Sequence, residues 1–352
     1  MLASLLYGAA LGHASEAPEA RGAGADAKSP HIALLLPTGS EAFARAAEAV
    51  RAGFIEASKK PVGRKLPVRL YAVTEDPQNV IASYRQALAG GAQIVVGPLT
   101  RRGVSALAAA ANLITVPTLA LNVPERTSTN AAKLYTLSLQ IEAEARQVAQ
   151  LALSEGRRKA FTVSEPTALA KRMRDAFVQE FERGGGHHIA EYAYTTDGAG
   201  LERMKQAAAL RVADMVFFAV DAPRLRMVRT QMAAMTAYGT SQLNPGLSAG
   251  LSGADVLDVR FVDMPWMVQP DHPAVMIYAR PGSRESDDLE RLYALGIDAF
   301  RVAEDLLEGK RDIELDGVTG RLKLGADGQF RRGLLVTLID GGKLTVLGES
   351  RP

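Results

Sequence analysis

The chain alternates between short, continuously apolar runs and longer segments in which apolar residues recur every three or four positions. The first run covers residues 32–36 (IALLL) and ends at Pro37-Thr38-Gly39. A continuous apolar run of this length is typical of a strand covered on both faces. Ser40 stands where it could cap a following helix. In that helix the apolar residues share one face, and they are Phe43, Ala47, Val50, Phe54 and Ala57.

The same unit repeats along the chain, and such alternation is the pattern of βαβ units in a parallel sheet. In the first series, strands are predicted at 68–73, 94–96 and 116–121, and helices at 78–88 and 100–112. The second series is predicted to contain helices at 142–154, 167–183, 200–210 and from Asp221 to about Met235, with strands at 160–163, 189–194 and 215–220. Two series of units predict two sheets in succession.

The C-terminal third departs from this alternation. A strand is predicted at 258–264, a long helix follows the cap residue Ser286, and short β runs are predicted at 321–324, 334–339 and 344–347. A lone helix followed by hairpins suits a chain that returns to the first lobe and then to the second. The predicted fold is α/β, with two doubly wound lobes around a hinge cleft. We expect residues 30–141 to form lobe 1, completed by about 268–310, and residues 142–267 to form lobe 2, completed by about 311–352.

The N-terminus is predicted to be an export leader. Residues 1–12 (MLASLLYGAALG) resemble a signal-peptide core, with a small-residue cleavage site after Ala14 or Ala17. Residues 18–29 have the composition of a disordered segment, so the leader is assigned to 1–29. No later run approaches the roughly 18 apolar residues that span a bilayer. The expected location is periplasmic, without a lipoprotein cysteine.

Composition excludes several classes of function. The 352 residues contain 41 basic and 39 acidic side chains, a net charge of +2, which is too weak a field to indicate nucleic acid or an anionic membrane as a partner. The chain has no cysteine, which excludes disulfides, thiol catalysis and thiolate metal sites. No dinucleotide or triphosphate motif occurs, so we expect no cofactor.

The motifs that could indicate catalysis or a metal lack the required context. Residues 246–250 (GLSAG) match the G-x-S-x-G pattern, but no strand precedes Ser248 and no helix follows it, so a loop is the preferred interpretation. His187 and His188 are adjacent and would point to opposite faces of a strand. His31 lies at a strand start and His272 beside a proline. We therefore expect neither an enzyme nor a metal site.

The remaining candidate site is the cleft, because ligands of open α/β sheets meet the loops at the carboxyl ends of the strands. For an amino-acid ligand, Glu165 or Asp221 could bind the ammonium group and Ser40 the carboxylate. Each candidate also has a structural alternative as a cap, a turn or a packing residue. The candidates are Thr38, Gly39, Ser40, Gly97, Pro98, Leu99 and Asn122 from the first lobe, and Ser164, Glu165, Asp221 and Trp266 from the second.

Four segments resemble the LppC, or penicillin-binding protein activator, family, and more broadly the type 1 periplasmic solute-binding proteins. They are IALLLPTGSEAFARAAEAVRAGF, AQIVVGPLTRRGVSALAAAA, YALGIDAFRVAEDLLEG and LDGVTGRLKLGADGQFRRGLLVTLIDGGKLTVLG. The resemblance implies a bilobed, non-enzymatic periplasmic protein whose relatives bind and stimulate a bifunctional peptidoglycan synthase. Relative to that family, we expect this chain to lack the lipoprotein cysteine and the preceding helical-repeat domain.

Two functions follow from these observations. The first is a regulatory protein that acts on a peptidoglycan synthase by contact. The alternative is a solute receptor that closes on an amino acid or another small polar ligand and delivers it to an ABC-type transporter.

Overall fold

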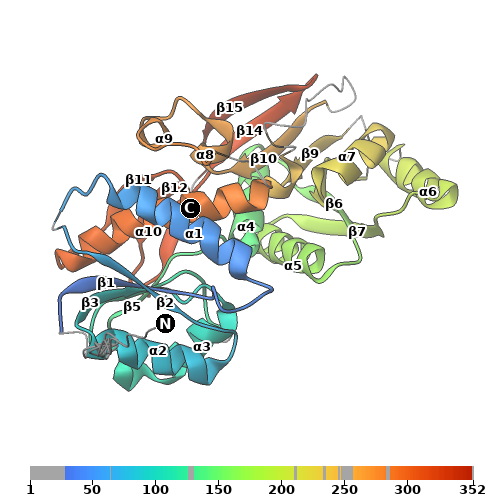
Figure 1. Cartoon of the computed structure of the whole chain (residues 1–352). Helices are drawn as coiled ribbons and strands as arrows, with labels where there is room; N and C mark the ends of the chain where they lie inside the picture. The colour runs from blue at the N-terminus through green and yellow to red at the C-terminus, as the bar shows by residue number, and fades with distance from the viewer. Residues whose placement is uncertain are drawn as a thin grey trace, which may run out of the picture.

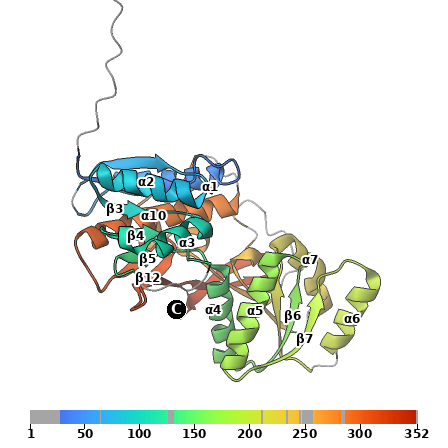
Figure 2. The same ribbon diagram turned by 90° about the horizontal axis from the view of Figure 1, so that it is seen from below.

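The computed structural model shows two α/β lobes side by side, joined along one edge (Figures 1 and 2). Residues 1–27 of the predicted leader, and Ser248 of the G-x-S-x-G pattern, lie outside the described residues. The structure describes residues 28–63, 65–125, 131–209, 212–232, 235–244, 246, 257–282 and 286–350.

The first lobe is built on a five-stranded parallel sheet in the order β2-β1-β3-β4-β5. Every residue of β1 is buried, as its apolar run predicts. The strands are β1 (His31–Leu36), β2 (Val68–Ala72), β3 (Ala92–Val96), β4 (Thr118–Ala120) and β5 (Leu134–Thr136). Its helices are α1 (Ala44–Ser58), α2 (Pro77–Ala89), α3 (Arg101–Ala109) and, from the far end of the chain, α10 (Asp287–Leu307).

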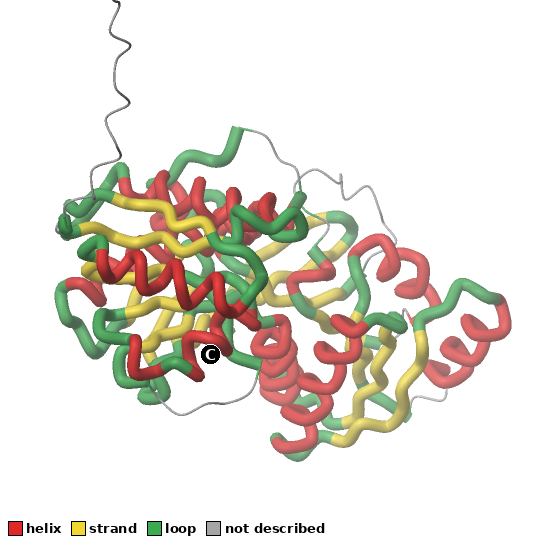
Figure 3. Tube along the Cα trace, turned by 60° about the horizontal axis from the view of Figure 1, so that its bottom comes forward, coloured by secondary structure: helices red, strands yellow, loops and turns green. Residues whose placement is uncertain are grey.

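The second lobe has a seven-stranded sheet in the order β15-β14-β10-β9-β8-β6-β7. Five of these strands run parallel, and β14 and β15 close one edge in antiparallel pairing. The strands are β6 (Lys159–Ser164), β7 (His187–Ala193), β8 (Met215–Ala219), β9 (Thr236–Gly239), β10 (Val259–Asp263), β14 (Leu335–Asp340) and β15 (Lys343–Glu349). Its helices are α4 (Ile141–Ser154), α5 (Ala168–Arg183), α6 (Gly198–Ala209) and α7 (Ala222–Arg229). The tube in Figure 3 shows helices flanking the strands in each lobe, so the predicted fold of two doubly wound lobes is confirmed.

One predicted helix is wrong in its extent. Asp221 caps α7 as expected, since its Oδ1 accepts a hydrogen bond from the Arg224 backbone N–H at 2.9 Å. The helix ends at Arg229 rather than near Met235, a 3₁₀ turn follows at Thr230–Met232, and the chain then enters β9. The sequence of β9, TAYG, is too short to show a strand period of its own.

A third, three-stranded antiparallel sheet lies between the lobes. It is formed by β11 (Glu314–Gly317), β12 (Gly320–Leu324) and β13 (Phe330–Gly333), and a bridge between Thr136 and Gln329 links it to the end of β5. The sequence assigns residues 311–352 as one unit to lobe 2, whereas only β14 and β15 join the sheet of that lobe. The division of the chain into domains stays a prediction.

The chain passes between the lobes three times, before α4, between β10 and α10, and between α10 and β14. The short helices α8 (Pro265–Val268) and α9 (Pro273–Met276) lie on the second passage. Three passages fix the relative position of the lobes more firmly than one linker would.

The α1 and α10 helices cross with their backbones in contact. A Cβ atom on Gly53 of α1 would lie 1.9 Å from the carbonyl oxygen of Tyr293, and one on Gly296 of α10 would lie 2.1 Å from the carbonyl oxygen of Val50. Both positions therefore require glycine, because any side chain would overlap the backbone of the facing helix. Next to the crossing, the rings of Phe54 and Phe300 pack edge to face at 5.2 Å.

Candidate functional site

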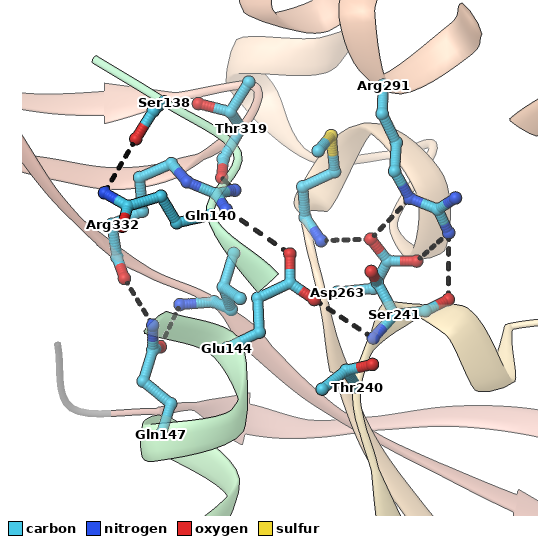
Figure 4. Close-up of polar contacts among 12 residues, drawn as sticks. Ser138, Gln140, Glu144, Gln147, Thr240, Ser241, Asp263, Arg291, Thr319 and Arg332 are labelled. Atoms are coloured by element: carbon cyan, nitrogen blue, oxygen red, sulfur yellow. Dashed lines mark hydrogen bonds and ion pairs between the residues drawn. The ribbon is translucent and has the colours of Figure 1, made fainter. Parts of the chain in front are cut away.

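A chain of buried polar residues joins the two lobes, and we call it the interlobe seam: Glu144, Ser241, Asp263, Arg291 and Arg332 (Figure 4). It contains two ion pairs. Arg291 Nη2 lies 2.9 Å from Asp263 Oδ2, and Arg332 Nη2 lies 3.4 Å from Glu144 Oε1. All four side chains are buried. Because each charge has a partner, the cost of removing it from water is partly offset.

The backbone of Ser241 connects the two ion pairs. Its N–H donates to Glu144 Oε2 at 3.2 Å, and its carbonyl oxygen accepts from Arg291 Nη2 at 3.0 Å. Asn244 Nδ2 donates to Asp263 Oδ2 at 2.8 Å. The seam therefore runs without interruption from the third sheet through α4 and the end of β10 to α10. Arg291 is its member in the first lobe, so a movement of the lobes that draws Arg291 away would break its charged hydrogen bonds to Asp263 and Ser241.

The third sheet is fixed to the same seam. Arg332 Nη1 donates to the carbonyl oxygen of Thr319 at 3.1 Å, and Gln147 Nε2 donates to the carbonyl oxygen of Arg332 at 2.9 Å. Asp298 of α10 accepts from the backbone N–H groups of Val318 and Thr319, at 3.1 and 2.8 Å. These buried hydrogen bonds join the third sheet to α4 of the second lobe and to α10 of the first.

Burial changes the proton affinities of the seam. Desolvation raises the pKa of Glu144 above its ordinary 4.5, and the Arg332 guanidinium only partly opposes the shift. For Arg291, burial lowers the pKa, but the carboxylates of Asp263, Glu144 and Asp288 together outweigh burial and the net pKa is raised. Arg291 therefore remains a cation, whereas Glu144 binds its proton more tightly than a free carboxyl group does.

We predict that the Glu144→Gln variant removes a pH dependence of stability. A carboxyl whose folded pKa is raised binds its proton more tightly in the folded chain, so its contribution to stability is complete below the ordinary pKa of 4.5 and is lost as pH rises through the folded pKa. The free energy of unfolding of the wild type minus that of E144Q should therefore fall as pH rises. Urea unfolding at a series of pH values measures this difference. A difference that grows with pH would mean that the attraction of Arg332 outweighs desolvation.

Two of the pockets beside the first turns of α10 include predicted cleft residues. One, of about 450 Å³, is lined by Asp221, Ser241 and Asn244 of the second lobe and by Asp288 and Arg291 of α10. The other, of about 440 Å³, lies in the first lobe. It is lined by Leu99 and Asn122, two of the predicted cleft residues, and by Phe43, Ala46, Glu75, Thr100, Arg101, Arg102 and Leu292.

The first-lobe candidates make contacts within the protein. Ser40 Oγ donates to Glu75 Oε1 at 2.7 Å. Its predicted role as a helix cap is wrong, since α1 begins after Phe43 and has no side-chain cap. Asn122 Nδ2 donates to the carbonyl oxygen of Leu99 at 3.0 Å. The ligand-binding role of these residues stays a prediction.

The loops after the first and third strands form backbone hydrogen bonds within the first lobe. The Gly39 N–H donates to the carbonyl oxygen of Val73, and the Thr38 N–H to that of Leu36. Gly97 has a φ of +110°, and a Cβ there would lie 2.0 Å from the carbonyl oxygen of Leu35, so only glycine fits. The carbonyl oxygen of Pro98 accepts from the Leu121 N–H at 3.0 Å.

The second-lobe candidates are also engaged with one another. Glu165 Oε1 accepts from the Asp221 N–H at 3.2 Å, and its Oε2 lies 3.5 Å from Arg224 Nε. Asp221 caps α7 and forms an ion pair with the same Arg224. Ser164 Oγ donates to Glu191 at 3.1 Å. The carboxylates expected to receive a ligand ammonium therefore already hold a cation of the protein.

Trp266 lies within the protein interior rather than on a cleft wall. Its side chain is fully buried, its indole Nε1–H donates to Glu290 Oε2 at 2.9 Å, and the Arg280 guanidinium lies 4.0 Å from the ring centroid. The backbone N–H of Trp266 donates to Val318 at 3.0 Å. It is a packing residue of the second passage between the lobes.

The side chains of His188 and His272 contact other groups of the protein. His187 and His188 begin β7, and His188 Nε2 contacts Thr162 Oγ1 at 3.1 Å. His272 caps α9 and has Asp316 3.6 Å from its Nε2. In the part of the chain that the structure describes, no three acidic or histidine side chains gather as metal ligands would, and no helix is long and apolar enough to cross a membrane.

None of the seam residues is among the candidate site residues predicted from the sequence. One signal was available on α4, where Ile141, Ala145, Val148 and Ala149 form a buried face that includes Glu144. A carboxylate at a position that helical periodicity places in the core needs a buried cation. Nothing local identifies Arg332 as that cation.

Two doubly wound sheets joined by three passages define a type 1 periplasmic-binding-protein-like fold. The chain belongs to the LppC family, whose model, described as "LppC putative lipoprotein", matches residues 25–211 and 196–336. A curated relative named "Penicillin-binding protein activator LpoA", from Photobacterium profundum, is 24% identical over 334 residues, which cover 85% of this chain and 54% of that protein. The chain thus spans about half the length of the curated relatives it matches.

Solved structures show the same fold. A protein of Chromobacterium violaceum described as a "putative branched-chain amino acid ABC transporter" is 39% identical, with a TM-score of 0.73 over 88% of this chain and 100% of that one. The "LpoA (YraM) C-domain from Haemophilus influenzae, a regulator of PBP1A" is 20% identical, with a TM-score of 0.74 over 91% of this chain and 100% of that domain.

Proposed function

We propose that this protein is a non-enzymatic, periplasmic regulator that activates a peptidoglycan synthase of the penicillin-binding protein class by direct contact. Membership of the LppC family supports this function, as does the match to the whole C-domain of a protein described as a regulator of PBP1A. Relatives of this family are named as activators rather than as enzymes.

The main support for this proposal is that the polar side chains of the predicted cleft already form ion pairs and hydrogen bonds with other residues of the protein. Glu165 and Asp221 form ion pairs with Arg224, and Ser40 donates a hydrogen bond to Glu75. A solute receptor needs such groups to exchange water for ligand, and a pair that must first be broken weakens binding by the cost of breaking it. The buried Arg291–Asp263 ion pair joins α10 of the first lobe to β10 of the second and favours this arrangement of the lobes. A rigid two-lobed body is suited to present a fixed surface to another protein.

Glycan polymerisation and cross-linking by a purified bifunctional synthase from the same organism test this function. Addition of the protein at a saturating concentration is expected to raise the rate of at least one of the two reactions. The matched control is an equal concentration of an unrelated two-lobed solute-binding protein. An unchanged rate, together with no retention of the synthase on the immobilised protein, would refute activation by contact.

A second candidate function is a receptor for a branched-chain amino acid or a similar polar solute. The 39% identity to the Chromobacterium violaceum protein favours it, as does the 440 Å³ pocket beside Leu99 and Asn122. A ligand present at about 100 times its dissociation constant would stabilise the fold by about 2.7 kcal/mol. Thermal unfolding with leucine, isoleucine and valine measures this, and a flat result would exclude these ligands.

A further inference from the structure

We propose that a positively charged hollow between α4, α5 and β13 binds an acidic segment of a protein partner. The hollow has a volume of about 310 Å³. We call it the arginine hollow and define it by Arg146, Gln147, Gln150, Arg183, Arg331 and Arg332, which line it. The proposal rests on the proposed function for the identity of the partner, a peptidoglycan synthase, but not for the chemistry of the site.

The charge of the hollow indicates the chemistry of its occupant. Four arginines line it, and Glu180 is the single acidic residue among its lining side chains. Glu180 lies 2.5 Å from Arg183, and two carboxylates outside the lining pair with two more of the arginines, Asp327 with Arg331 at 3.0 Å and Glu144 with Arg332 at 3.4 Å. Four arginines against three carboxylates leave an excess of one cation. Arg183 and Arg331 are themselves exposed, so exchanging their partners for ligand carboxylates costs little. The planar guanidinium group is the side chain best suited to bidentate binding of carboxylates.

The floor of the hollow is fixed by its own hydrogen bonds. Arg332 and Gln147 are buried, and the Gln147 side chain donates to the carbonyl oxygen of Arg332 at 2.9 Å. Gln150 Nε2 donates to Glu180 Oε1 at 2.8 Å. Because these groups belong to the interlobe seam or adjoin it, the floor does not have to reorganise when a ligand arrives.

The rim, in contrast, consists of exposed cations. The side chains of Arg183 and Arg331 are 71% and 54% exposed, and Arg146 is exposed as well. Arg146 and Arg183 come from the helices α4 and α5 of the second lobe, whereas Arg331 comes from β13 of the third sheet. A ligand that reaches all three must span two parts of the fold.

The exposure of the rim favours a chain of carboxylates over a single small anion. One exposed ion pair contributes at most about 1 kcal/mol, too little to hold an isolated anion. An extended acidic peptide places several carboxylates in succession and can meet the rim arginines together. Binding of this kind depends on electrostatic steering, so it should weaken as the salt concentration rises.

The test compares two double variants of the full chain with equal changes in charge. Arg146→Gln with Arg331→Gln neutralises two rim cations, and the control Arg203→Gln with Lys205→Gln neutralises two exposed cations on α6. The midpoint of urea unfolding verifies that all variants are folded. Binding at low salt is measured with two probes, the purified synthase and a synthetic oligoglutamate peptide.

For the synthase, R146Q/R331Q is expected to bind about tenfold more weakly than the wild type, with a smaller salt dependence, because two ion pairs of about 0.7 kcal/mol are lost. R203Q/K205Q should bind as the wild type does. If the synthase binds all three proteins equally, the arginine hollow is not its docking site, although the proposed function survives.

Binding of the oligoglutamate peptide tests the arginine hollow independently of the proposed function. If the synthase does not bind the wild type, the proposed function fails, and the peptide alone decides about the hollow. Peptide binding that is lost in R146Q/R331Q and kept in the control supports an acidic-peptide site. Equal peptide binding by both variants refutes it, and so does binding of phosphatidylglycerol vesicles in place of the peptide, since that would assign the cations to a membrane surface.

Discussion

Replacement of Gly53 by alanine is expected to lower the free energy of unfolding by about 2–3 kcal/mol, because it forces the α1 and α10 backbones apart. The added Cβ would lie 1.9 Å from the Tyr293 carbonyl oxygen, and a backbone atom of a buried helix cannot move aside as a side chain can. The intrinsic preference of helices for alanine over glycine recovers about 1 kcal/mol of a larger steric cost. Gly296→Ala should act in the same way, since its Cβ would lie 2.1 Å from Val50.

The control for this experiment is Gly198→Ala at the start of α6. A Cβ at Gly198 meets nothing within 4 Å, so the variant should be as stable as the wild type or slightly more stable. Urea unfolding can be followed by the fluorescence of Trp266, the one tryptophan of the sequence, which packs against Tyr293 of α10 at 5.5 Å. Equal midpoints for G53A and G198A would show that the two helices are not in backbone contact.

The second large effect is expected from the Arg291→Met variant, which should cost about 3–5 kcal/mol. The substitution keeps a long side chain in place but leaves the buried Asp263 carboxylate without its cation. A charge buried in this way either stays unpaired or must take up a proton. Chemical denaturation at neutral pH measures the loss.

Two further variants separate the charge effect from the loss of packing. Arg51→Met removes the partner of Glu48 in an exposed pair on α1, and it should cost less than about 1 kcal/mol. The double variant Asp263→Leu with Arg291→Met removes both buried charges and should recover a large part of the loss. If R291M were no less stable than R51M, the seam would not hold the lobes together.

The sequence predicts the elements of the fold because its signals are local. The buried strand β1 and the one-sided helix α1 are each visible within about fifteen residues of sequence. Strands of three or four residues, such as β5, β9 and β13, have no readable period and depend on the neighbours with which they pair. They were missed for that reason.

The candidate site was less predictable, because its contacts join distant parts of the chain. The position of Ser40 indicates a cap for the adjacent helix, yet its partner is Glu75, 35 positions away. Glu144 and Arg332 are 188 positions apart. A single sequence shows that Glu144 lies on an apolar helix face. It does not show which of the many arginines in the chain pairs with Glu144. The predicted topology identifies the loop residues at the carboxyl ends of the strands. It does not identify the hydrogen bonds and ion pairs that these residues form with one another.

The contact between α1 and α10 also has a consequence for biosynthesis. Ribosomes make the chain from its N-terminus, so α1 is complete long before its partner at Asp287–Leu307 has been made. Until then, the face of α1 that contains Val50, Gly53 and Phe54 lacks the helix that crosses it in the folded protein. The first lobe therefore cannot be completed until most of the second lobe has been made, and a nascent chain that stops before residue 287 exposes an apolar surface that favours chaperone binding or aggregation.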